Sequence, residues 1–213
     1  MKTNYQKILD NTLADISKNG KTPVLLLHVC CAPCSSYVLE YLTEFFNIVI
    51  FFYNPNISPN EEYIYRLNEV KRLVRELPLK NSVTIIEGDY SPEVFFSLAK
   101  GLENERERGL RCQKCIAHRL EIAADMAKKI GADFFTTTLT ISPHKDSEFI
   151  NSAGGEIAEK VGIPYLFSDF KKREGYKRSI QLSAEYNLYR QNFCGCVYSK
   201  MEWQMLNDRH KQV

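Results

Sequence analysis

The sequence predicts an α/β protein: a parallel sheet flanked by helices, followed by an irregular helical C-terminal part. Four short apolar segments alternate with longer segments whose apolar residues recur at helical spacing. Such alternation is typical of a parallel sheet with helices on both faces. The first apolar segment, residues 24–29, is a nearly continuous run of Val and Leu, as expected for a strand buried on both faces. The length of 213 residues suffices for one domain with a full core, residues 1–213.

The individual elements can be placed in chain order. Strands are expected at residues 24–29, 48–53, 83–86 and 134–138, where apolar and β-branched residues gather. Helices are expected at residues 4–18, after a capping Ser35 or Ser36, after the Asn- and Pro-rich loop 54–60, from Pro92, and between Cys115 and Gly131. Helical spacing places Ile8 and Ile64 on the buried faces of their helices.

Beyond about residue 140 the pattern is less regular. Prolines and glycines interrupt it at Pro143, Gly154, Gly155, Gly162, Pro164 and Gly175. We therefore expect short helical pieces in this part of the chain, without internal repeats and without a domain linker.

The composition bears on the class of partner. The net charge of +2 argues neither for nor against a nucleic acid. No apolar segment approaches the ~20 residues needed to span a bilayer, so no membrane partner is expected. The N-terminal segment leads into an amphipathic pattern and lacks the apolar core of a signal peptide, which predicts a cytoplasmic protein.

Seven cysteines form three tight groups, and this clustering is the main functional signal. An odd number of cysteines without an export signal argues against a framework of structural disulfides. In a reducing compartment the thiols stay free for metal binding or redox chemistry. A single cysteine is often only a small core hydrophobe, but three such groups favour chemistry. The groups are Cys30, Cys31 and Cys34; Cys112 and Cys115; and Cys194 and Cys196.

The first two groups predict a metal or redox centre. Cys30, Cys31 and Cys34 follow the first strand, and ligands of open α/β sheets bind at the carboxyl ends of strands. Cys112 and Cys115 precede the helix that feeds the fourth strand, so they belong at the same rim. Their spacing suits one metal centre or a dithiol redox pair. Adjacent thiolates fit a single tetrahedral zinc ion poorly but can bind different irons, so we favour an iron–sulfur cluster over zinc.

Cys194 and Cys196 are separated by Gly195 alone. A disulfide between them would close a small, strained ring that is readily reduced, and Gly195 would permit the unusual backbone angles. We favour a two-electron redox pair; two further metal ligands or two inert thiols are the alternatives.

Residues 136–146 combine hydroxyl groups, a lysine and a helix start after the fourth strand. They suit an anion or ribose site, although Ser142 or Asp146 could equally cap a helix. His144 could shuttle protons, but a lone loop histidine is more often a surface residue. His28 points either into the core or at the thiols, and the sequence does not decide between them.

A basic segment, residues 171–178, carries five positive charges and one negative charge. Basic residues interleaved with aromatic ones fit RNA binding through phosphate contacts and base stacking. A solvated basic surface is the alternative, although Gly175 suggests a loop and favours contact. The candidate RNA-binding residues are Lys171, Lys172, Arg173, Tyr176, Lys177 and Arg178.

These motifs together resemble one family, the cobalamin-independent epoxyqueuosine reductases, QueH. The combination of Cys-Cys-x-x-Cys, Cys-x-x-Cys and a late Cys-Gly-Cys is specific, and the resemblance covers nearly the whole chain. It implies a fold like that of the HUP and adenine-nucleotide α-hydrolase proteins. The matching segments are LLLHVCCAPCSSYVLEYL at 25–42, FYNPNISPNEEYIYR at 52–66, RCQKCIAHRL at 111–120, TTTLTISPHKD at 136–146 and FKKREGYKRSIQLSAEYNLYRQNFCGCVYS at 170–199.

The resemblance implies an enzyme that reduces epoxyqueuosine to queuosine at the wobble position of tRNA. This is the last step of queuosine biosynthesis, a two-electron removal of the epoxide oxygen. The partners would be tRNA carrying epoxyqueuosine and an external electron donor. Two other functions stay open: a zinc- or cluster-bearing RNA-binding module without catalysis, and a thiol oxidoreductase that acts on proteins.

The same resemblance implies roles for the cysteines. A [4Fe-4S] cluster is expected on Cys30, Cys31, Cys112 and Cys115. Cys194 and Cys196 match the redox-active pair of the family. Some members bind an additional mononuclear iron near the cluster, through cysteine and a carboxylate, and Cys34 is the candidate ligand for it here.

Overall fold

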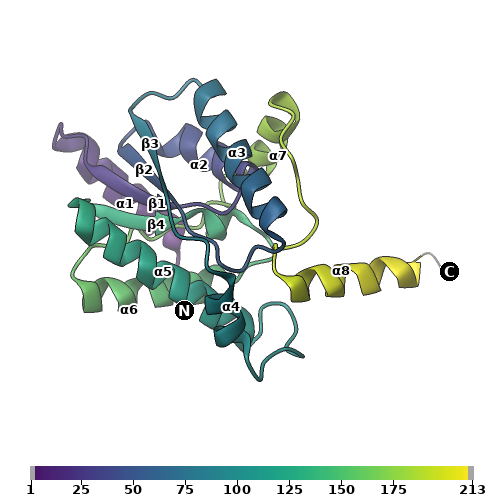
Figure 1. Cartoon of the computed structure of the whole chain (residues 1–213). Helices are drawn as coiled ribbons and strands as arrows, with labels where there is room; N and C mark the ends of the chain where they lie inside the picture. The colour runs from purple at the N-terminus through teal and green to yellow at the C-terminus, as the bar shows by residue number, and fades with distance from the viewer. Residues whose placement is uncertain (1–2, 211–213) are drawn as a thin grey trace.

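A computed structural model describes residues 3–210 of the chain and confirms the parallel α/β architecture (Figure 1). Four strands pair in parallel, in the order β3-β2-β1-β4. They are β1 (Val24–His28), β2 (Asn47–Phe52), β3 (Val83–Glu87) and β4 (Phe134–Thr137). Each strand lies within one residue of the expectation: β1 and β4 end one residue earlier than expected, β3 ends one residue later, and β2 begins and ends one residue earlier.

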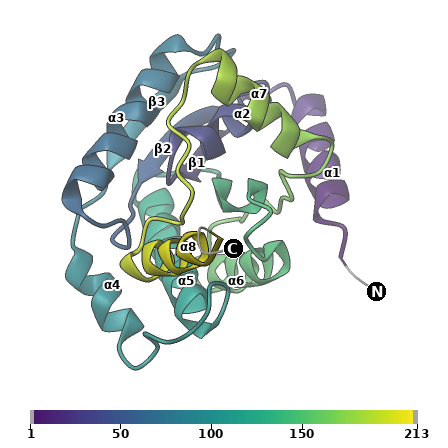
Figure 2. The same cartoon turned by 90° about the vertical axis from the view of Figure 1, so that its right-hand side faces the viewer.

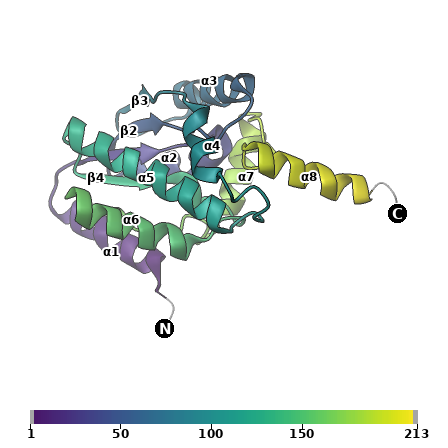
Figure 3. The same ribbon diagram turned by 60° about the horizontal axis from the view of Figure 1, so that its bottom comes forward.

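Helices cover both faces of the sheet, as expected. One apolar core lies between the sheet and α1 (Tyr5–Lys18), α2 (Ala32–Leu42) and α3 (Asn60–Glu76). A second core lies between the other face and α5 (Leu110–Ile130) and α6 (Ser147–Val161), two helices that lie side by side in Figure 3. The remaining helices are α4 (Pro92–Ala99), the short 3₁₀ helix η1 (Thr138–Ile141), α7 (Gly175–Glu185) and α8 (Val197–His210). Figure 2 shows α7 beside α2.

The strand order places a ligand-binding crevice at one point of the sheet edge. From β1 the chain moves to β2 and β3 on one side, whereas β4 pairs with the other side of β1. The order therefore reverses between β1 and β4, and in open α/β sheets ligands bind at the carboxyl ends of strands beside such a switch point. The end of β1 leads to the turn 30–34, and the end of β4 leads through η1 to Lys145.

The start of α2 differs from the expectation. Neither Ser35 nor Ser36 caps this helix, because it begins at Ala32 with Cys31 as its N-cap. Pro33 lies in the first turn, where its fixed backbone angle and missing N–H are tolerated, and it moves the helix start upstream. The Ser35 hydroxyl instead donates to the carbonyl of Cys31 at 2.6 Å, inside the helix.

Two apolar residues expected in the core are on the surface. Ile8 is 37% exposed and Ile64 is 46% exposed. Polar residues occupy the neighbouring buried positions: Gln6 on α1 and Arg66 on α3. Since a helix buries one stripe, a buried Arg66 next to Leu67 turns Ile64 toward solvent.

The C-terminal part is more regular than expected. Gly154 and Gly155 do not interrupt the chain but lie inside the 15-residue helix α6. A Cβ atom on Gly154 would stand 2.5 Å from the Tyr165 ring, so this glycine lets the helix approach that aromatic side chain closely. Tyr165 in turn bridges to Phe135 of β4, which anchors the segment after α6 to the sheet edge.

Among residues 3–210, none of the helices combines the length and the apolar character that a bilayer crossing requires.

Candidate functional site

All three cysteine groups lie at the amino ends of helices. Cys31 is the N-cap of α2, and Cys196 directly precedes α8, where its sulfur accepts a hydrogen bond from the Ser199 backbone N–H at 3.3 Å. Cys112 and Cys115 were expected to precede α5, but they lie within its first turns. Unpaired N–H groups and the helix dipole favour negative charge at such ends. Three helices therefore present a favourable environment for thiolates or an anionic group.

The early start of α5 has a local cause. Gly109 is the N-cap of α5, and the Glu105 carboxylate accepts a hydrogen bond from the Leu110 N–H at 3.1 Å. A Cβ atom on Gly109 would collide with that carboxylate, so a larger residue here would have to displace the Glu105 side chain from this contact. The helix can therefore begin at Leu110, two residues before Cys112.

Cys30, Cys31 and Cys34 form a compact triad. Their sulfur atoms lie within 4.8 Å of one another, close enough to share a metal centre. Hydrogen bonds from Cys30 and Cys34 lower the pKa of Cys31 well below its usual value. The same contact with Cys31 raises the pKa of Cys30 to about 11, and hydrogen bonds to Cys30 and Cys31 raise the pKa of Cys34. The triad thus concentrates negative charge on Cys31.

The other four cysteines line a pocket next to the triad. Cys112, Cys115, Cys194 and Cys196 share its walls with Arg119 and Lys145. Cys115 and Cys196 are buried against Phe95, and burial raises the pKa of Cys115 to about 11. All seven cysteines are free thiols in this structure. Gly195 has the positive φ of 119° that the sequence led us to expect.

A larger cavity of about 590 Å³ opens beside this pocket. Cys30, Cys34 and Cys194 line it, together with Arg119 and Lys145. Cys194, Arg119 and Lys145 therefore belong to the walls of both spaces. The size falls within the range of small-molecule sites, and the reactive sulfurs meet it at the switch point of the sheet.

Four buried cations surround the cysteines. Arg66, Arg111 and Arg119 are at most 2% exposed, and the Lys145 side chain is 8% exposed. Arg66 pairs with Glu62, and Lys145 pairs with Glu107. Within residues 3–210, no carboxylate forms an ion pair with Arg111 or Arg119. A buried charge without a counter-charge is costly, so the site has a surplus of positive charge to be met by thiolates or by a bound anionic group.

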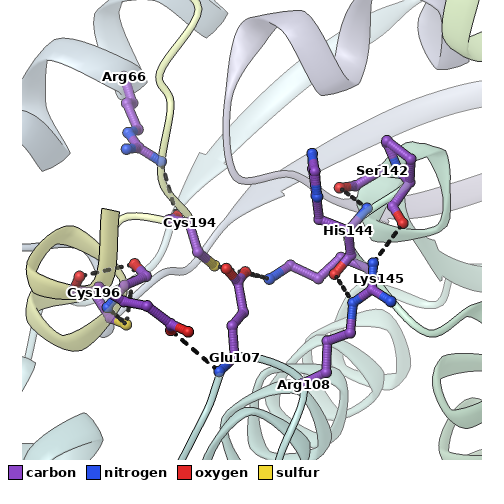
Figure 4. A network of polar contacts seen from close by, with 11 residues as sticks. Arg66, Glu107, Arg108, Ser142, His144, Lys145, Cys194 and Cys196 are labelled. Carbon is purple, nitrogen blue, oxygen red and sulfur yellow. Dashed lines mark hydrogen bonds and ion pairs between the residues drawn. The ribbon is translucent and has the colours of Figure 1, made fainter. Parts of the chain in front are cut away.

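Arg66 ties the third cysteine group to the rest of the site. Its Nε donates to Glu62 at 2.7 Å, and its Nη1 donates to the carbonyl oxygen of Cys194 at 3.1 Å (Figure 4). Its Nη2 is buried and has no hydrogen-bond partner among the described residues. A Cβ atom on Gly195 would stand 3.0 Å from Nη1, so glycine also makes room for this guanidinium group.

Lys145 contacts the outer sulfur of the pair directly. Its Nζ lies 2.8 Å from the Glu107 carboxylate and 3.2 Å from Cys194 Sγ (Figure 4). Burial acts to lower the pKa of Lys145, but the charges of Cys194 and Glu107 outweigh it and the pKa is raised. Arg108 donates to the carbonyls of Pro143 and His144 and so holds the lysine loop against the Glu107 loop.

The candidates after β4, and His28 at the end of β1, are mostly structural. Asp146 caps α6 by accepting hydrogen bonds from the N–H groups of Glu148 and Phe149, which confirms the capping alternative. His28 points into the core, between Thr137 Oγ1 at 2.9 Å and the Tyr53 carbonyl at 3.1 Å. Burial lowers the pKa of His28 to about 4, so it is neutral at physiological pH and donates from Nε2. His144 is exposed and lines the rim of the large cavity.

The basic segment, residues 171–178, is partly helical, and most of its charged side chains form ion pairs. Gly175 begins α7, so Tyr176, Lys177 and Arg178 are helical. Ion pairs engage Lys171 with Asp169, Arg173 with Asp10, Lys177 with Glu174, and Arg178 with Glu40 and Glu185. Lys172 is exposed and has no ion-pair partner among residues 3–210, and Tyr176 lines the large cavity.

Comparison with known proteins identifies a family. The model of the family "Epoxyqueuosine reductase QueH" matches residues 25–202. A QueH epoxyqueuosine reductase of Staphylococcus epidermidis is 43% identical over 205 residues, covering 94% of this chain and 86% of that protein. One from Streptococcus pyogenes is 44% identical, covering 93% and 78%. A third, from Thermotoga maritima, is 38% identical, covering 89% and 95%.

The contact between Lys145 and Cys194 predicts a difference in reactivity. Replacing Lys145 by Met should slow alkylation of Cys194 by iodoacetamide roughly tenfold or more, because a hydrogen bond to a charged group is worth about 1.5–3 kcal/mol and the thiolate is the reactive form. Lys145→Arg should retain most of the rate. The measurement is peptide mass spectrometry over time at neutral pH. Lys200→Met, which removes an ammonium group over the Phe193 ring, is the matched control. Equal rates in all four proteins would contradict the assigned contact.

Proposed function

The chain belongs to the epoxyqueuosine reductase QueH family, and we propose on that premise that it is an oxidoreductase that reduces epoxyqueuosine to queuosine at the wobble position of tRNA. The observation that carries this proposal is the meeting of three cysteine groups at two adjoining spaces that share Cys194, beside the switch point of the sheet. A tRNA substrate would place the reaction in the cytoplasm. The proposal treats residues 1–213 as one catalytic unit, since α7 and α8 contribute walls to the same cavity.

The electrons and atoms of the reaction balance with the Cys194–Cys196 pair as reductant. Conversion of the epoxide to an alkene releases its oxygen as water and consumes two electrons and two protons. Oxidation of two thiols to a disulfide supplies two electrons and two protons. Cys194 lines the cavity, whereas Cys196 is 6% exposed behind it. After each turnover an external donor must reduce the disulfide again.

The first two cysteine groups are the proposed ligands of a [4Fe-4S] cluster. Cys30, Cys31, Cys112 and Cys115 would hold it. The donor chemistry fits, because a cluster bound by four thiolates is anionic and this site has a surplus of buried positive charge at Arg111 and Arg119. When bound, such a cluster supplies electrons one at a time.

A further single iron is proposed on Cys34. This sulfur belongs to the compact triad and lines the large cavity. Two carboxylates, Glu107 and Glu202, line the same cavity, so a mixed sulfur and oxygen donor set is present there. Sulfur and carboxylate donors are compatible with iron, although Glu107 is also the partner of Lys145.

Lys145 is the proposed stabiliser of the departing epoxide oxygen. A C–O bond breaks more easily when a fixed positive charge faces the oxygen. Lys145 lines the cavity beside Cys194, and its raised pKa keeps it an ammonium group at neutral pH. The wobble base must turn out of the anticodon stack to reach this group, as bases do in other enzymes that modify them.

The cluster assignment predicts a pattern of iron content. Each of Cys30→Ala, Cys31→Ala, Cys112→Ala and Cys115→Ala should lower iron and acid-labile sulfide and remove the brown colour of anaerobically purified protein, because each removes a proposed thiolate ligand. Cys194→Ser should retain both and serves as the control. A colourless wild-type protein that contains zinc would favour the RNA-binding module without catalysis. Full iron in all four variants would show that the ligands lie elsewhere.

The redox pair predicts a separation of cofactor content from turnover. Wild-type protein with a chemical reductant should convert epoxyqueuosine tRNA over many turnovers, seen by mass spectrometry of digested tRNA as loss of one oxygen atom. Cys194→Ser and Cys196→Ser should keep iron and tRNA binding but stop converting the tRNA, because one remaining thiol cannot form the disulfide that supplies the two electrons. Loss of iron would make these sulfurs ligands, and undiminished turnover would remove them from the mechanism. No conversion by the wild type would refute the proposed function.

The basic segment is a proposed tRNA contact, centred on Lys172 and Tyr176. Lys171, Arg173, Lys177 and Arg178 remain proposed contributors, although each has a carboxylate partner. The segment adjoins the cavity, because Tyr176 is one of its wall residues. Lys172, whose charge has no ion-pair partner in the described part of the chain, is the clearest phosphate contact.

Charge reversal at Lys172 should weaken tRNA binding and reduce the slope of log affinity against log salt by about one, the value for one phosphate contact. Lys129→Glu is the control, because this exposed lysine lies at the far end of α5, away from the cysteines. Filter-binding titrations at several salt concentrations provide the measurement. Identical slopes for both variants would favour the solvated-surface alternative.

A further inference from the structure

Helix α8 forms one wall of the large cavity. Its cavity-lining residues are Ser199, Glu202, Trp203 and Leu206. Their spacing of three and four residues places them on one face of the helix. Beyond its first turns α8 projects away from the body of the molecule, as Figures 1 and 3 show. The face of α8 that lines the cavity therefore extends outward, away from the body of the molecule.

The base of α8 is fixed to the site. Cys196 Sγ accepts a hydrogen bond from the Ser199 N–H, and the Glu202 carboxylate accepts one from the Glu107 N–H at 3.3 Å. Through the second contact α8 is tied to Glu107, which pairs with Lys145. A ligand in the large cavity, which Cys30, Cys34 and Cys194 also line, lies beside this face.

Large apolar side chains stay exposed at this wall. Trp203 is 37% exposed and Leu206 is 52% exposed. The Phe193 ring, next to Cys194 in the chain, also lines the cavity and lies with its centroid 6.5 Å from that of Trp203. Arg190 lines the cavity as well, and Lys200 Nζ lies 5.9 Å from the Phe193 ring centroid. Aromatic faces and positive charge thus occur together at the mouth.

Single-stranded nucleic acid is recognised by this combination. Unpaired bases stack on aromatic side chains, while nearby cations meet the phosphates. A wobble base held near Cys194 would bring its neighbours in the anticodon loop to the cavity mouth. Those neighbours are unpaired and have open stacking faces once the wobble base has turned out.

We propose that Trp203 and Phe193 form a stacking platform for the unpaired nucleotides that flank the modified base in the anticodon loop. This inference rests on the proposed function, because it takes the cavity as the site of the wobble base. A second copy of this chain covering the exposed face of α8 is the competing occupant, and the experiment below separates the two.

Trp203 is the single tryptophan of the chain, so its emission reports this one position. The probe is a short, unmodified hairpin RNA with an anticodon loop, titrated into anaerobically purified protein. We expect the hairpin to quench Trp203 emission along the same binding curve that RNA anisotropy gives. In anisotropy titrations Trp203→Ala should bind about tenfold to a hundredfold more weakly, the range for loss of one stacked base, and Trp203→Phe should bind nearly as well as wild type.

Met205→Ala is the matched control. Met205 is a 58% exposed apolar residue of the same helix that is not among the cavity-lining residues, so its loss should leave RNA affinity unchanged. RNA binding without a change in Trp203 emission would overturn the platform, as would equal affinity of Trp203→Ala and wild type. Emission that shifts with protein concentration in the absence of RNA would assign the face to a second copy instead. Wild-type protein that neither binds the hairpin nor converts epoxyqueuosine tRNA would overturn the proposed function and the platform together, whereas conversion with unchanged emission would overturn the platform alone.

Discussion

A surplus of buried positive charge is the constraint on which the site depends. Arg111 and Arg119 lie in the interior beside the cysteines without a carboxylate partner in residues 3–210, and Arg66 and Lys145 have one each. Guanidinium groups stay protonated, so this charge cannot be removed by titration. It must be balanced by negative charge on sulfur or on a group that sulfur binds. The helix ends at Cys31, Cys112 and Cys196 add to the same field, which is why the thiols and the cations are best understood as one unit.

The fold was predictable where it depended on local patterns. The buried strands are apolar runs, and the cysteine groups stand out because thiols rarely cluster by chance. Patterns could not show the partners of the cysteines. Arg66 and Arg119 look like ordinary surface cations of amphipathic helices, and Glu107 belongs to a charge-rich loop. Their roles depend on contacts with residues up to 128 positions away, as in the bond between Arg66 and Cys194. No single-sequence pattern carries that information, although the buried position of Arg66 between Tyr63 and Leu67 is a weak signal.

The errors in element starts and in the basic segment share a cause. A residue type predicts what a side chain can do but not which neighbour satisfies it. Ser35 can cap a helix, yet Pro33 moved the start of α2 past it. Gly154 can break a helix, yet it makes room for Tyr165 inside one. Residues 171–178 do carry a local positive charge, but Asp10 of α1 and Glu40 of α2 pair with both arginines of this segment. These ion pairs hold the C-terminal part against the helices that cover the sheet.

The small pocket and the large cavity share part of their walls, and the sulfurs of Cys194 and Cys196 differ in which of these spaces they line. Cys194 lines both the small pocket and the large cavity, whereas Cys196 lines the small pocket only. Lys145, which contacts Cys194 Sγ, also lines both spaces. In the proposed reaction a substrate in the large cavity can meet one sulfur of the pair, and the other is reached only through its partner or through the side of Cys112 and Cys115. In the proposed reaction, such a pair would deliver electrons to a substrate in the large cavity and receive electrons from the side of the small pocket. Gly195 turns the chain between the two sulfurs, and the hydrogen bond from Arg66 to the Cys194 carbonyl holds that turn in place.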